Sequence, residues 1–370
     1  MARYIYQLPD WPNFHWNDAL LLPKLSQVRH EQGVLVGKMS NLGFELKQEA
    51  LLETYTLDVL KSTEIEGEFL NPEQVRSSIA RHLGMDIGAL LPADRGVEGV
   101  VEMILDATQN AQLPLTEDRI CDWHAGLFPT GRSGMYKINV AKYRKDETGP
   151  MQVVSGAWGR EKVHFQAPEA TKLEHEMRQF TDWFNHQQGL DPVIKAGIAH
   201  LWFVTIHPFD DGNGRIARAI TDLQLARAEG NFSRFYSMSA EIRIQRKGYY
   251  DILEKTQKET LEVTPWLSWF LDCLHNALDS THKVLDGILY KARFWEKHAT
   301  TVLNQRQILL INKLLGPFEG KLTSSKWAKI AKCSPDTALR DIQDLVINEI
   351  LEKDEGGGRS TSYRLKQLVF

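Results

Sequence analysis

The sequence has few cysteines and no long apolar segment. Its three cysteines, Cys121, Cys273 and Cys333, lie far apart, form no Cys-x-x-Cys pair and are odd in number. This pattern is typical of a reducing compartment and argues against a disulfide scaffold or a cysteine-ligated zinc site. No apolar run approaches the roughly 20 residues that a membrane-spanning helix requires. The first residues also lack the apolar core of a signal peptide. We therefore expect a cytoplasmic protein with no membrane partner.

The chain also lacks an excess of charge of one sign. Its formal net charge is −4 over 370 residues, so its composition does not indicate a general nucleic-acid or membrane-surface binder. With 42% hydrophobic and 25% charged residues, the composition is ordinary for a globular protein. At roughly 150 residues per domain, the length suggests two or three domains.

Helical periodicity dominates what is present. Apolar residues recur at helical spacing from Asn17 to Leu60, and Asn71-Pro72-Glu73 is typical of a helix start. The stretches Met151–Gly156 and Lys162–Phe165 differ, because their alternating pattern predicts two short strands joined by Ala157-Trp158-Gly159-Arg160. A β-hairpin is therefore expected inside a helical protein. Further helices are predicted at 97–110, 116–127, 173–186, 193–206, 216–229, 242–259 and from 264 onward.

The tail from about Gln305 has a pattern of its own. Its order is helix, helix, turn, helix and hairpin, which is typical of a winged helix. Ser334 is expected to cap the third helix, Asp336–Ile350, and Gly356-Gly357-Gly358-Arg359 would lie in the hairpin turn. The third helix carries Arg340 against four acids, Asp336, Asp341, Asp344 and Glu349. A helix in the DNA major groove normally presents basic or amide groups, so we expect this domain to bind a protein target or to dimerise.

One segment combines residue types suited to phosphate chemistry: His207-Pro208-Phe209-Asp210-Asp211-Gly212-Asn213-Gly214-Arg215-Ile216-Ala217-Arg218. Its glycines allow backbone N–H groups to approach an anion, and the loop leads into a helix N-terminus, which attracts phosphate. Arg215 and Arg218 are three residues apart and so share a helix face at that end.

Two further side chains of this segment have functions of their own. Asp211 supplies a hard oxygen ligand, suited to a Mg²⁺ ion that is shared with phosphates. His207 precedes a proline and is expected to end its helix, which places an imidazole beside the loop. The ordinary pKa of histidine suits a general base. A lone Asp-Gly-Asn-Gly run would only indicate a turn, so the prediction depends on the whole combination.

This segment resembles the signature of the Fic (Fido) family, HPFx[D/E]GNGRxxR, and all fixed positions of that pattern are present. The resemblance, together with the patterns above, implies a mainly α fold with a helical Fic core, a β-hairpin flap, an N-terminal helical cap region and a C-terminal winged-helix-like domain. The expected boundaries are 1–95 for the cap region, 96–275 for the core with its flap at about 151–165 and its signature loop at 207–218, 276–300 for a linker helix, and 301–370 for the winged-helix-like domain.

The resemblance implies a protein adenylyltransferase. Such an enzyme transfers AMP from ATP to a serine, threonine or tyrosine hydroxyl of a target protein or of itself, and releases pyrophosphate. His207 would deprotonate the hydroxyl and Asp211 would bind Mg²⁺. The backbone of Gly212, Asn213 and Gly214 would form an anion hole, while Arg215 and Arg218 would hold the β and γ phosphates. Tyr249 and Tyr250 lie in a later helix where related proteins hold the adenine, although they could equally be ordinary core or surface tyrosines.

A second motif lies upstream, at Ser62-Thr63-Glu64-Ile65-Glu66-Gly67. By itself it is a polar helix end at which Gly67 could stop the helix. It resembles the inhibitory motif [S/T]xxxE[G/N] of many Fic proteins, and Ser62, Glu66 and Gly67 match. The resemblance implies that Glu66 pairs with Arg218, takes the arginine from the γ-phosphate and misorients ATP.

Two functions of different classes remain open at this stage. One is the autoinhibited adenylyltransferase, for which self-modification and a homodimer are possible. The other is a DNA-binding regulator whose Fic core is only a nucleotide sensor. Within the family, the intact Gly214-Arg215 disfavours the kinase variant, which has an altered motif.

Overall fold

The structure is a computed structural model, and it describes residues 4–40, 42–85, 91–147, 149–156, 160, 162–230, 234–315, 318, 320–354 and 361–367. The chain divides into two compact units, Met1–His282 and Lys283–Phe370. The helix α11 runs from Thr264 to Lys297 without a break, and the two units divide within it. The expected domain boundaries stay predictions.

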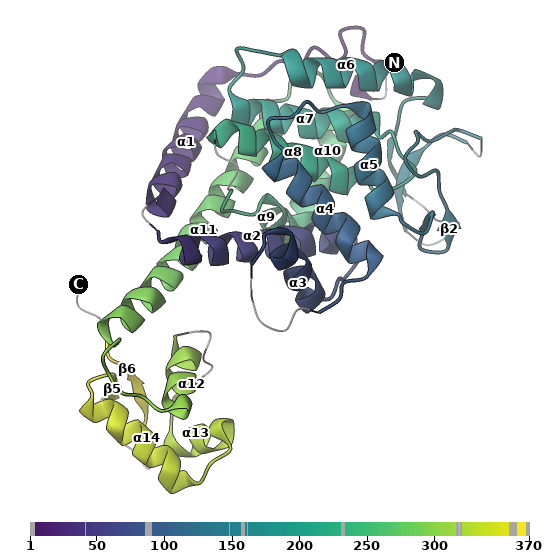
Figure 1. Cartoon of the computed structure of the whole chain (residues 1–370). Coiled ribbons are helices and arrows are strands. Elements are labelled where there is room, and N and C mark those ends of the chain that lie inside the picture. Colours follow the sequence, from purple (N-terminus) through teal and green to yellow (C-terminus); the bar gives the residue numbers. More distant parts are fainter. Residues whose placement is uncertain are drawn as a thin grey trace. The chain divides into compact units, whose positions relative to one another are not determined.

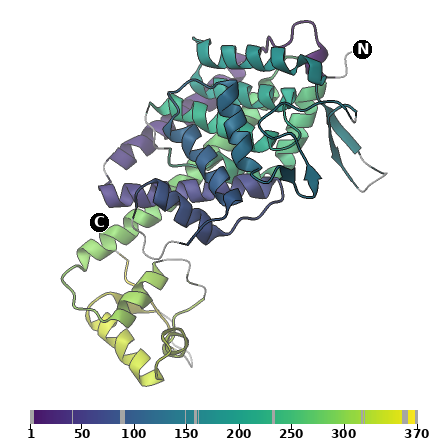
Figure 2. The ribbon, with the colours of Figure 1, turned by 45° about the vertical axis from the view of Figure 1, so that its right-hand side comes forward.

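The first unit is mainly helical, which confirms the predicted fold class (Figures 1 and 2). Its two short hairpins are β1 (Arg132–Ser133) with β2 (Tyr136–Lys137), and β3 (Gln152–Ser155) with β4 (Lys162–Gln166). Its helices are η1 (Ile5–Gln7), α1 (Asp18–Ser40), α2 (Phe44–Ile65), α3 (Pro72–His82), α4 (Arg95–Gln109), α5 (Glu117–Leu127), η2 (Ala170–Lys172), α6 (Leu173–His186), α7 (Pro192–Ile206), α8 (Asn213–Glu229), α9 (Met238–Ile244), α10 (Arg246–Lys258) and the first part of α11.

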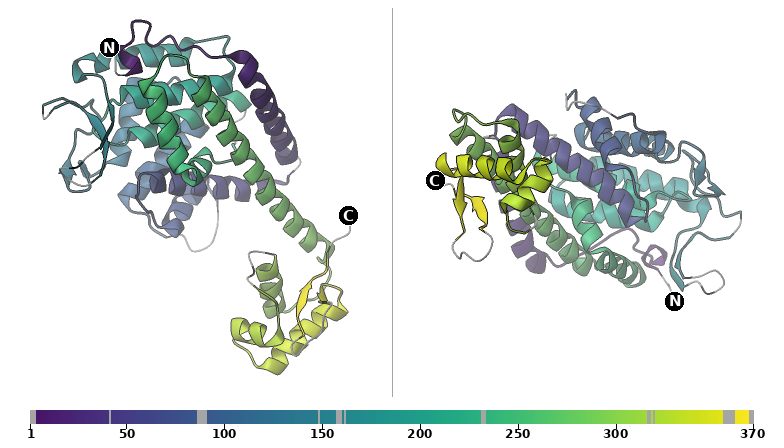
Figure 3. Two further views of the ribbon diagram at one scale, coloured as in Figure 1. Left: turned by 180° about the vertical axis from the view of Figure 1, so that it is seen from behind. Right: turned by 90° about the horizontal axis from the view of Figure 1, so that it is seen from below.

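The core of this unit is built around α7 and α8, which lie in its middle (Figure 1). Every residue of α7 from Val193 to Ile206 is buried, as expected of a helix whose residues are mostly apolar on every side. α7 packs directly against α8, and the view from behind shows α10 and α11 on the far side (Figure 3). Because α7 ends at Ile206 and α8 begins at Asn213, the signature loop lies at one end of this pair.

Local sequence signals explain where several helices begin. The side chain of Asn71 accepts hydrogen bonds from the backbone N–H groups of Glu73 and Gln74, so the predicted helix start is confirmed. The predicted helix at 242–259 is instead two helices, α9 and α10. Ser237 caps α9 by accepting a hydrogen bond from Ala240 N. The helical conformation is interrupted at Gln245, between α9 and α10. The residues 157–159, which belong to the turn predicted between β3 and β4, lie outside the described residues.

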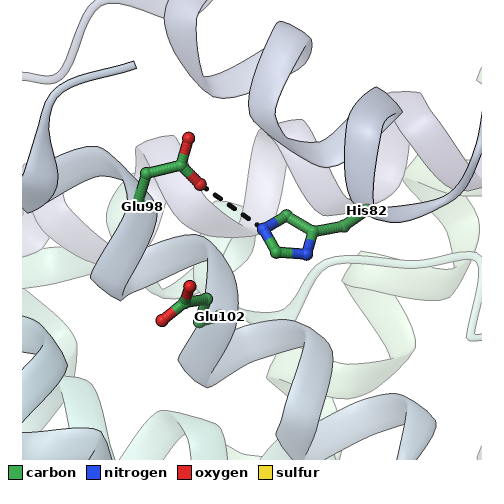
Figure 4. Close-up of side chains that lie close together, drawn as sticks. All are labelled: His82, Glu98 and Glu102. Atoms are coloured by element: carbon green, nitrogen blue, oxygen red, sulfur yellow. Dashed lines mark hydrogen bonds and ion pairs between the residues drawn. The ribbon is translucent and has the colours of Figure 1, made fainter. Parts of the chain in front are cut away.

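Two contacts fix α4 against its neighbours. α4 crosses α5 at Gly99 and Gly126, so closely that a Cβ at position 99 would collide with the carbonyl of Gly126. On the other side, Glu98 accepts hydrogen bonds from Ser78 Oγ at 2.7 Å and Arg81 Nη2 at 2.5 Å. Figure 4 shows the longer contact of the same carboxylate with His82, at 3.4 Å, and Glu102 one turn further along α4. The donors from α3 satisfy Glu98, so this cluster is explained as a helix–helix contact.

The second unit contains α12 (Gln305–Leu314), α13 (Ser324–Ala331), α14 (Pro335–Ile347) and the antiparallel strands β5 (Leu351–Lys353) and β6 (Tyr363–Leu365). Tyr363 also forms a bridge to Leu322. Ser334 caps α14 as predicted, accepting a hydrogen bond from Thr337 N at 3.2 Å. The order of elements is the one predicted for a winged helix, while residues 356–359 of the predicted turn lie outside the described residues.

The acidic side chains of α14 do not all point to solvent, although their number in the sequence suggested a strongly acidic exposed face. Asp341 is 4% exposed and receives two hydrogen bonds from Arg306. Asp344 accepts a hydrogen bond from Gln307 Nε2 at 2.6 Å. Both carboxylates therefore serve the contact between α14 and α12. The acid count overstates the negative charge of the exposed face, and the expectation about DNA stays a prediction. Among the described residues, no helix combines the length and apolar character that a membrane crossing requires.

Candidate active site

A cavity of about 520 Å³ opens beside the signature loop. Such a volume falls in the range of small-molecule sites, about 300–1,000 Å³. Its walls come from the end of α2, the β3–β4 hairpin, the signature loop and α10. It brings together many residues that the sequence singled out: Glu66, His207, Asp211, Gly212, Asn213, Gly214, Tyr249 and Tyr250. Arg215 and Arg218 lie behind this lining and are each 2% exposed.

His207 is the C-cap residue that follows α7, and it adopts a left-handed backbone conformation, with φ 52° and ψ 60°. A non-glycine residue in this region carries backbone strain that its surroundings must offset. Arg144 does so, because its Nε donates to the carbonyl of His207 at 2.8 Å and its backbone N–H donates to the carbonyl of Pro208 at 2.9 Å. No sequence pattern marks Arg144, which comes from an irregular loop.

The imidazole of His207 is prepared to accept a proton. Its Nδ1 lies 3.3 Å from the carbonyl of Val204, a contact that assigns the proton to Nδ1 and makes Nε2 the nitrogen that can accept a proton. Burial lowers the pKa of His207 to about 4. The side chain is therefore neutral at pH 7, as a general base must be.

Asp211 is oriented by two hydrogen bonds. Its Oδ1 accepts from the backbone N–H of Gly212 at 2.6 Å, and its Oδ2 accepts from the hydroxyl of Ser133 in β1. The neighbouring Asp210 accepts from the backbone N–H and the side-chain amide of Asn139. Ser133 and Asn139 were missed by the sequence analysis, because they precede the loop by more than 65 positions in a segment without periodic structure.

His124 holds the signature loop through its ring nitrogens, and the sequence analysis did not identify this residue either. Its Nδ1 accepts from the backbone N–H of Ala141 at 3.1 Å, and its Nε2 donates to the carbonyl of Asp211 at 3.2 Å. Burial lowers the pKa of His124 to about 4, in keeping with a neutral ring that uses one nitrogen as acceptor and the other as donor. The ring also stacks on Phe209, with centroids 4.2 Å apart.

The start of α8 presents backbone donors. The side chain of Asn213 bonds to both the N–H and the C=O of Phe209, at 3.0 and 2.8 Å, so it braces the loop and only its backbone remains for an anion. Gly212 has φ 82°, and a Cβ there would lie 2.9 Å from the ring of Phe128. Only glycine fits this position without strain. The unpaired N–H groups at the helix start, with the helix dipole, favour a bound anion.

Arg218 is held by the end of α2. Its Nε donates to Ser62 Oγ at 3.0 Å, and its Nη2 donates to the carbonyl of Ser62 and to Glu66 Oε1, both at 2.8 Å. Glu66 Oε1 also lies only 2.4 Å from the position that a Cβ at Gly214 would take. Ser62 and Glu66 of the upstream motif thus contact the signature helix, and Gly67 (φ 86°) turns the chain directly after Glu66.

A second carboxylate engages the other arginine of the signature. Glu68 Oε2 lies 2.7 Å from Arg215 Nη1. The guanidinium of Arg215 also lies over the ring of Phe128, 5.0 Å from its centroid. Within the described part of the chain, its buried Nε has no hydrogen-bond partner. Glu68 was not predicted, although its place two residues after Glu66, across Gly67, is a signal that could have identified it.

The two tyrosines of α10 differ in what they can offer. Tyr249 is 2% exposed, and its hydroxyl is hydrogen-bonded to His200 Nε2 at 2.8 Å. Tyr250 is 36% exposed, and its ring lies under the guanidinium of Arg246 at 5.3 Å. Their assignment to the adenine stays a prediction.

The β3–β4 hairpin forms the outer wall of the cavity. Its register pairs Gln152 with Gln166 and Ser155 with Lys162. The sequence predicted both strands but not this register. Phe165 packs inward against Tyr4 of the N-terminal segment, which ties the hairpin to the rest of the unit.

Comparisons with known proteins match two parts of the chain. Residues 114–225 match the model of the Fic/DOC family, and residues 4–85 match a domain of unknown function (DUF4172). The protein adenylyltransferase Fic of Drosophila willistoni is 26% identical over 231 residues, which are 61% of this chain and 41% of that protein. That of Drosophila grimshawi is 34% identical over 162 residues, 43% of this chain and 28% of that protein. The chain thus spans less than half the length of these curated relatives.

Solved structures share the fold. A Fic family protein from Desulfovibrio desulfuricans aligns over 94% of this chain and 97% of its own, with a TM-score of 0.52 and 21% identity. A Fic domain containing signaling protein from Bacteroides thetaiotaomicron aligns over 71% of this chain and 97% of its own, with a TM-score of 0.52 and 22% identity. At sequence identities this low, the similarity supports a shared fold and nothing more.

Proposed function

This chain belongs to the Fic family, and on that premise we propose that it is a protein adenylyltransferase. One observation carries the proposal: a single cavity joins the neutral imidazole of His207 to the N-terminus of α8. The first group can take a proton from a hydroxyl, and the second can hold a polyphosphate. Curated relatives named protein adenylyltransferase support the same activity.

The chemistry follows from these positions. Nε2 of His207 takes the proton of a target hydroxyl, and the resulting oxygen attacks the α-phosphorus of ATP. The bond from that phosphorus to the bridging oxygen breaks, and pyrophosphate leaves. The backbone N–H groups of Asn213 and Gly214 and the guanidinium groups of Arg215 and Arg218 neutralise the phosphates, while Gly212, whose own N–H is bonded to Asp211 Oδ1, forms the turn that presents them. Such a transfer requires positioning and charge neutralisation more than covalent help from the protein.

The donor set around Asp211 fits a magnesium ion. Its carboxylate faces the cavity, is oriented by Gly212 and Ser133, and offers the hard oxygen that Mg²⁺ prefers. We propose that Asp211 holds the ion together with the phosphates, where a bound Mg²⁺ would neutralise phosphate charge.

We also propose that the resting protein is autoinhibited. Glu66 takes a hydrogen bond from Arg218 that the γ-phosphate would otherwise receive, and its carboxylate covers Gly214 at the start of α8. Glu68 engages Arg215 in the same way. A charge-assisted pair with a buried arginine is strong enough to compete with a phosphate for the guanidinium.

The deciding experiment is incubation of the full chain with α-labelled ATP in a cell lysate, followed by mass spectrometry. Label on protein hydroxyls, lost in His207→Ala, is expected. Retention on duplex DNA without any label would instead favour the regulator whose Fic core is a nucleotide sensor.

A further inference from the structure

Three charged side chains form a cluster in the interior of the first unit. They are Asp58 on α2, Asp222 on α8 and Arg234 in the connection between α8 and α9. Asp58 and Arg234 are 0% exposed and Asp222 is 1% exposed. Arg234 Nη2 donates to Asp58 Oδ2 at 2.5 Å and lies 2.9 Å from Asp222 Oδ1. None of the three lines the cavity, and the mechanism described above uses none of them.

The hydrogen bonds show which carboxyl group of the cluster is charged. Two carboxyl groups face one guanidinium, and an unbalanced buried charge is costly, so one of them holds a proton. Asp58 accepts from Arg234 and from the hydroxyl of Ser237. Within the described part of the chain, neither oxygen of Asp222 has a hydrogen-bond partner. Burial raises the pKa of both groups, and the proton goes to Asp222 because hydrogen bonds favour the ionised form of Asp58.

The charged carboxylate lies on the same helix face as the inhibitory motif. Asp58 precedes Ser62 by four residues and Glu66 by eight, and residues at this spacing share one face of a helix. This face makes two polar contacts with the structure around α8. One joins Ser62 and Glu66 to Arg218. The other, two turns earlier in α2, joins Asp58 to Arg234.

The ion pair supplies what apolar packing cannot. α2 packs against α9, α3 and α4, and its buried side chains include Leu52, Tyr55 and Val59. Apolar contacts have no preferred direction, so they do not by themselves select one rotation of the helix. A shift by one residue turns a helix by about 100° and would direct Glu66 away from Arg218. A buried ion pair adds little net stability but can specify a single arrangement.

We propose that Asp58 is a positioning residue for autoinhibition: its ion pair with Arg234 fixes α2 in the register that brings Glu66 to Arg218. The inference rests on the autoinhibited adenylyltransferase proposed above. Arg234 and Ser237 belong to the segment that follows α8, so this contact holds α2 to the part of the chain that also carries the signature arginines. Asp58 acts through Glu66 and takes no part in the chemistry.

The test measures self-labelling of the full chain with α-labelled ATP in wild type, Asp58→Asn, Glu66→Gly and the double variant. Asp58→Asn keeps the shape of the side chain, and Asp222 can then ionise as the partner of Arg234, so the interior stays balanced in charge. A hydrogen bond to a neutral group is weaker than one to a charged group by about fivefold in an equilibrium constant. Labelling should rise by about that factor. In the Glu66→Gly background the same substitution should change nothing, because no inhibitory contact is left to position.

A merely structural aspartate predicts a different pattern. Asp58→Asn would then lower labelling in both backgrounds through loss of folded protein, and this result would overturn the proposal, as would acceleration by the same factor in both. Asp222→Asn is the matched control, because it alters the same cluster but leaves Asp58 paired with Arg234. It should leave labelling unchanged. Equal acceleration by the two variants would mean that general loosening of the cluster, and not the position of α2, is responsible.

Hydrogen exchange of the full chain tests the position of α2 without any reaction. Amides 62–66, in the last turn of α2, should exchange faster in Asp58→Asn and at the wild-type rate in Asp222→Asn. Unchanged exchange in a folded Asp58→Asn variant would refute the inference. If that variant does not fold, Arg234→Lys keeps the positive charge and loses the planar fork of donors, and it should act in the same direction. Absence of label from every variant would contradict the proposed function, while the exchange rates would still decide the role of Asp58.

Discussion

Glu66 Oε1 accepts a hydrogen bond from Arg218 Nη2 at 2.8 Å and also lies 2.4 Å from the position that a Cβ at Gly214 would take. One carboxylate thus occupies the arginine and covers the helix start that we propose bind the phosphates of ATP. Glu66→Gly should therefore accelerate self-labelling. A hydrogen bond to a charged group is worth about 1.5–3 kcal/mol, so we expect a gain of roughly tenfold to a hundredfold.

The control for this prediction is the double variant Glu66→Gly/Arg218→Ala. It should lose the gain, because the freed arginine is what the single substitution supplies. Incorporation of α-labelled ATP is compared among wild type, both single variants and the double variant at one protein concentration. If a folded Glu66→Gly variant is no faster than wild type, Glu66 is not the brake.

Glu68 should contribute a smaller brake. It is 49% exposed in its side chain, whereas Arg215 is 3% exposed, and an ion pair with one exposed partner is worth about 0.2–1 kcal/mol. Glu68→Gln should raise the affinity for ATP and ADP by roughly 1.5- to 5-fold and leave that for AMP unchanged, because Arg215 is expected to hold a β or γ phosphate. Titration calorimetry measures all three.

Glu64→Gln is the matched control for Glu68. Glu64 lies in the last turn of α2 and pairs with Lys61 at 2.8 Å and Arg243 at 3.5 Å, not with an arginine of the signature. Its substitution should leave all three affinities unchanged. Equal effects of the two variants would mean that the general loss of negative charge, and not the pair with Arg215, is responsible.

His207→Ala should abolish label transfer, by on the order of 10²–10⁴, and largely preserve ATP binding. The lowered pKa adds a pH prediction. A base must be unprotonated, and a histidine with a pKa of about 4 stays neutral as the pH falls from 7.5 to 5.5. Transfer at saturating Mg²⁺ and ATP should change little over that range, whereas a histidine with an ordinary pKa would lose about tenfold. An NMR titration in which the His207 imidazole becomes protonated near pH 6.5 would refute the assignment.

Gly99→Ala should destabilise the first unit, because its Cβ would collide with the backbone of Gly126 and helices cannot separate without loss of packing. Overpacking of this kind costs about 1–3 kcal/mol or more. Gly96→Ala, three residues earlier in α4, meets only Asp94 Oδ1 at 3.4 Å. It should be neutral or stabilising by up to about 1 kcal/mol. Denaturant unfolding of both variants provides the measurement, and similar destabilisation by both would contradict the close approach.

The sequence alone identified the residues whose roles depend on neighbours in the chain. Asn71 and Ser334 were recognised as caps because a cap bonds to N–H groups only two or three residues away. The signature segment was recognised because a helix N-terminus, two arginines and a carboxylate within twelve residues have few other uses. The resemblance to a known family then suggested that Glu66 would meet Arg218, a pairing across 152 positions that is present in the structure.

Tertiary packing decided the remaining parts of the site. Arg144, His124 and Ser133 reach the signature loop from segments 63 to 87 positions away, and no local pattern marks them. The inward direction of Asp341 follows from which face of α14 packs on α12, and composition cannot reveal that face. Periodicity and capping act over a few residues, whereas contacts between distant segments form where apolar faces are buried together. This burial also places distant polar side chains next to one another. The contacts of His164 with Ser155 and Glu254 are an example that only the folded chain reveals.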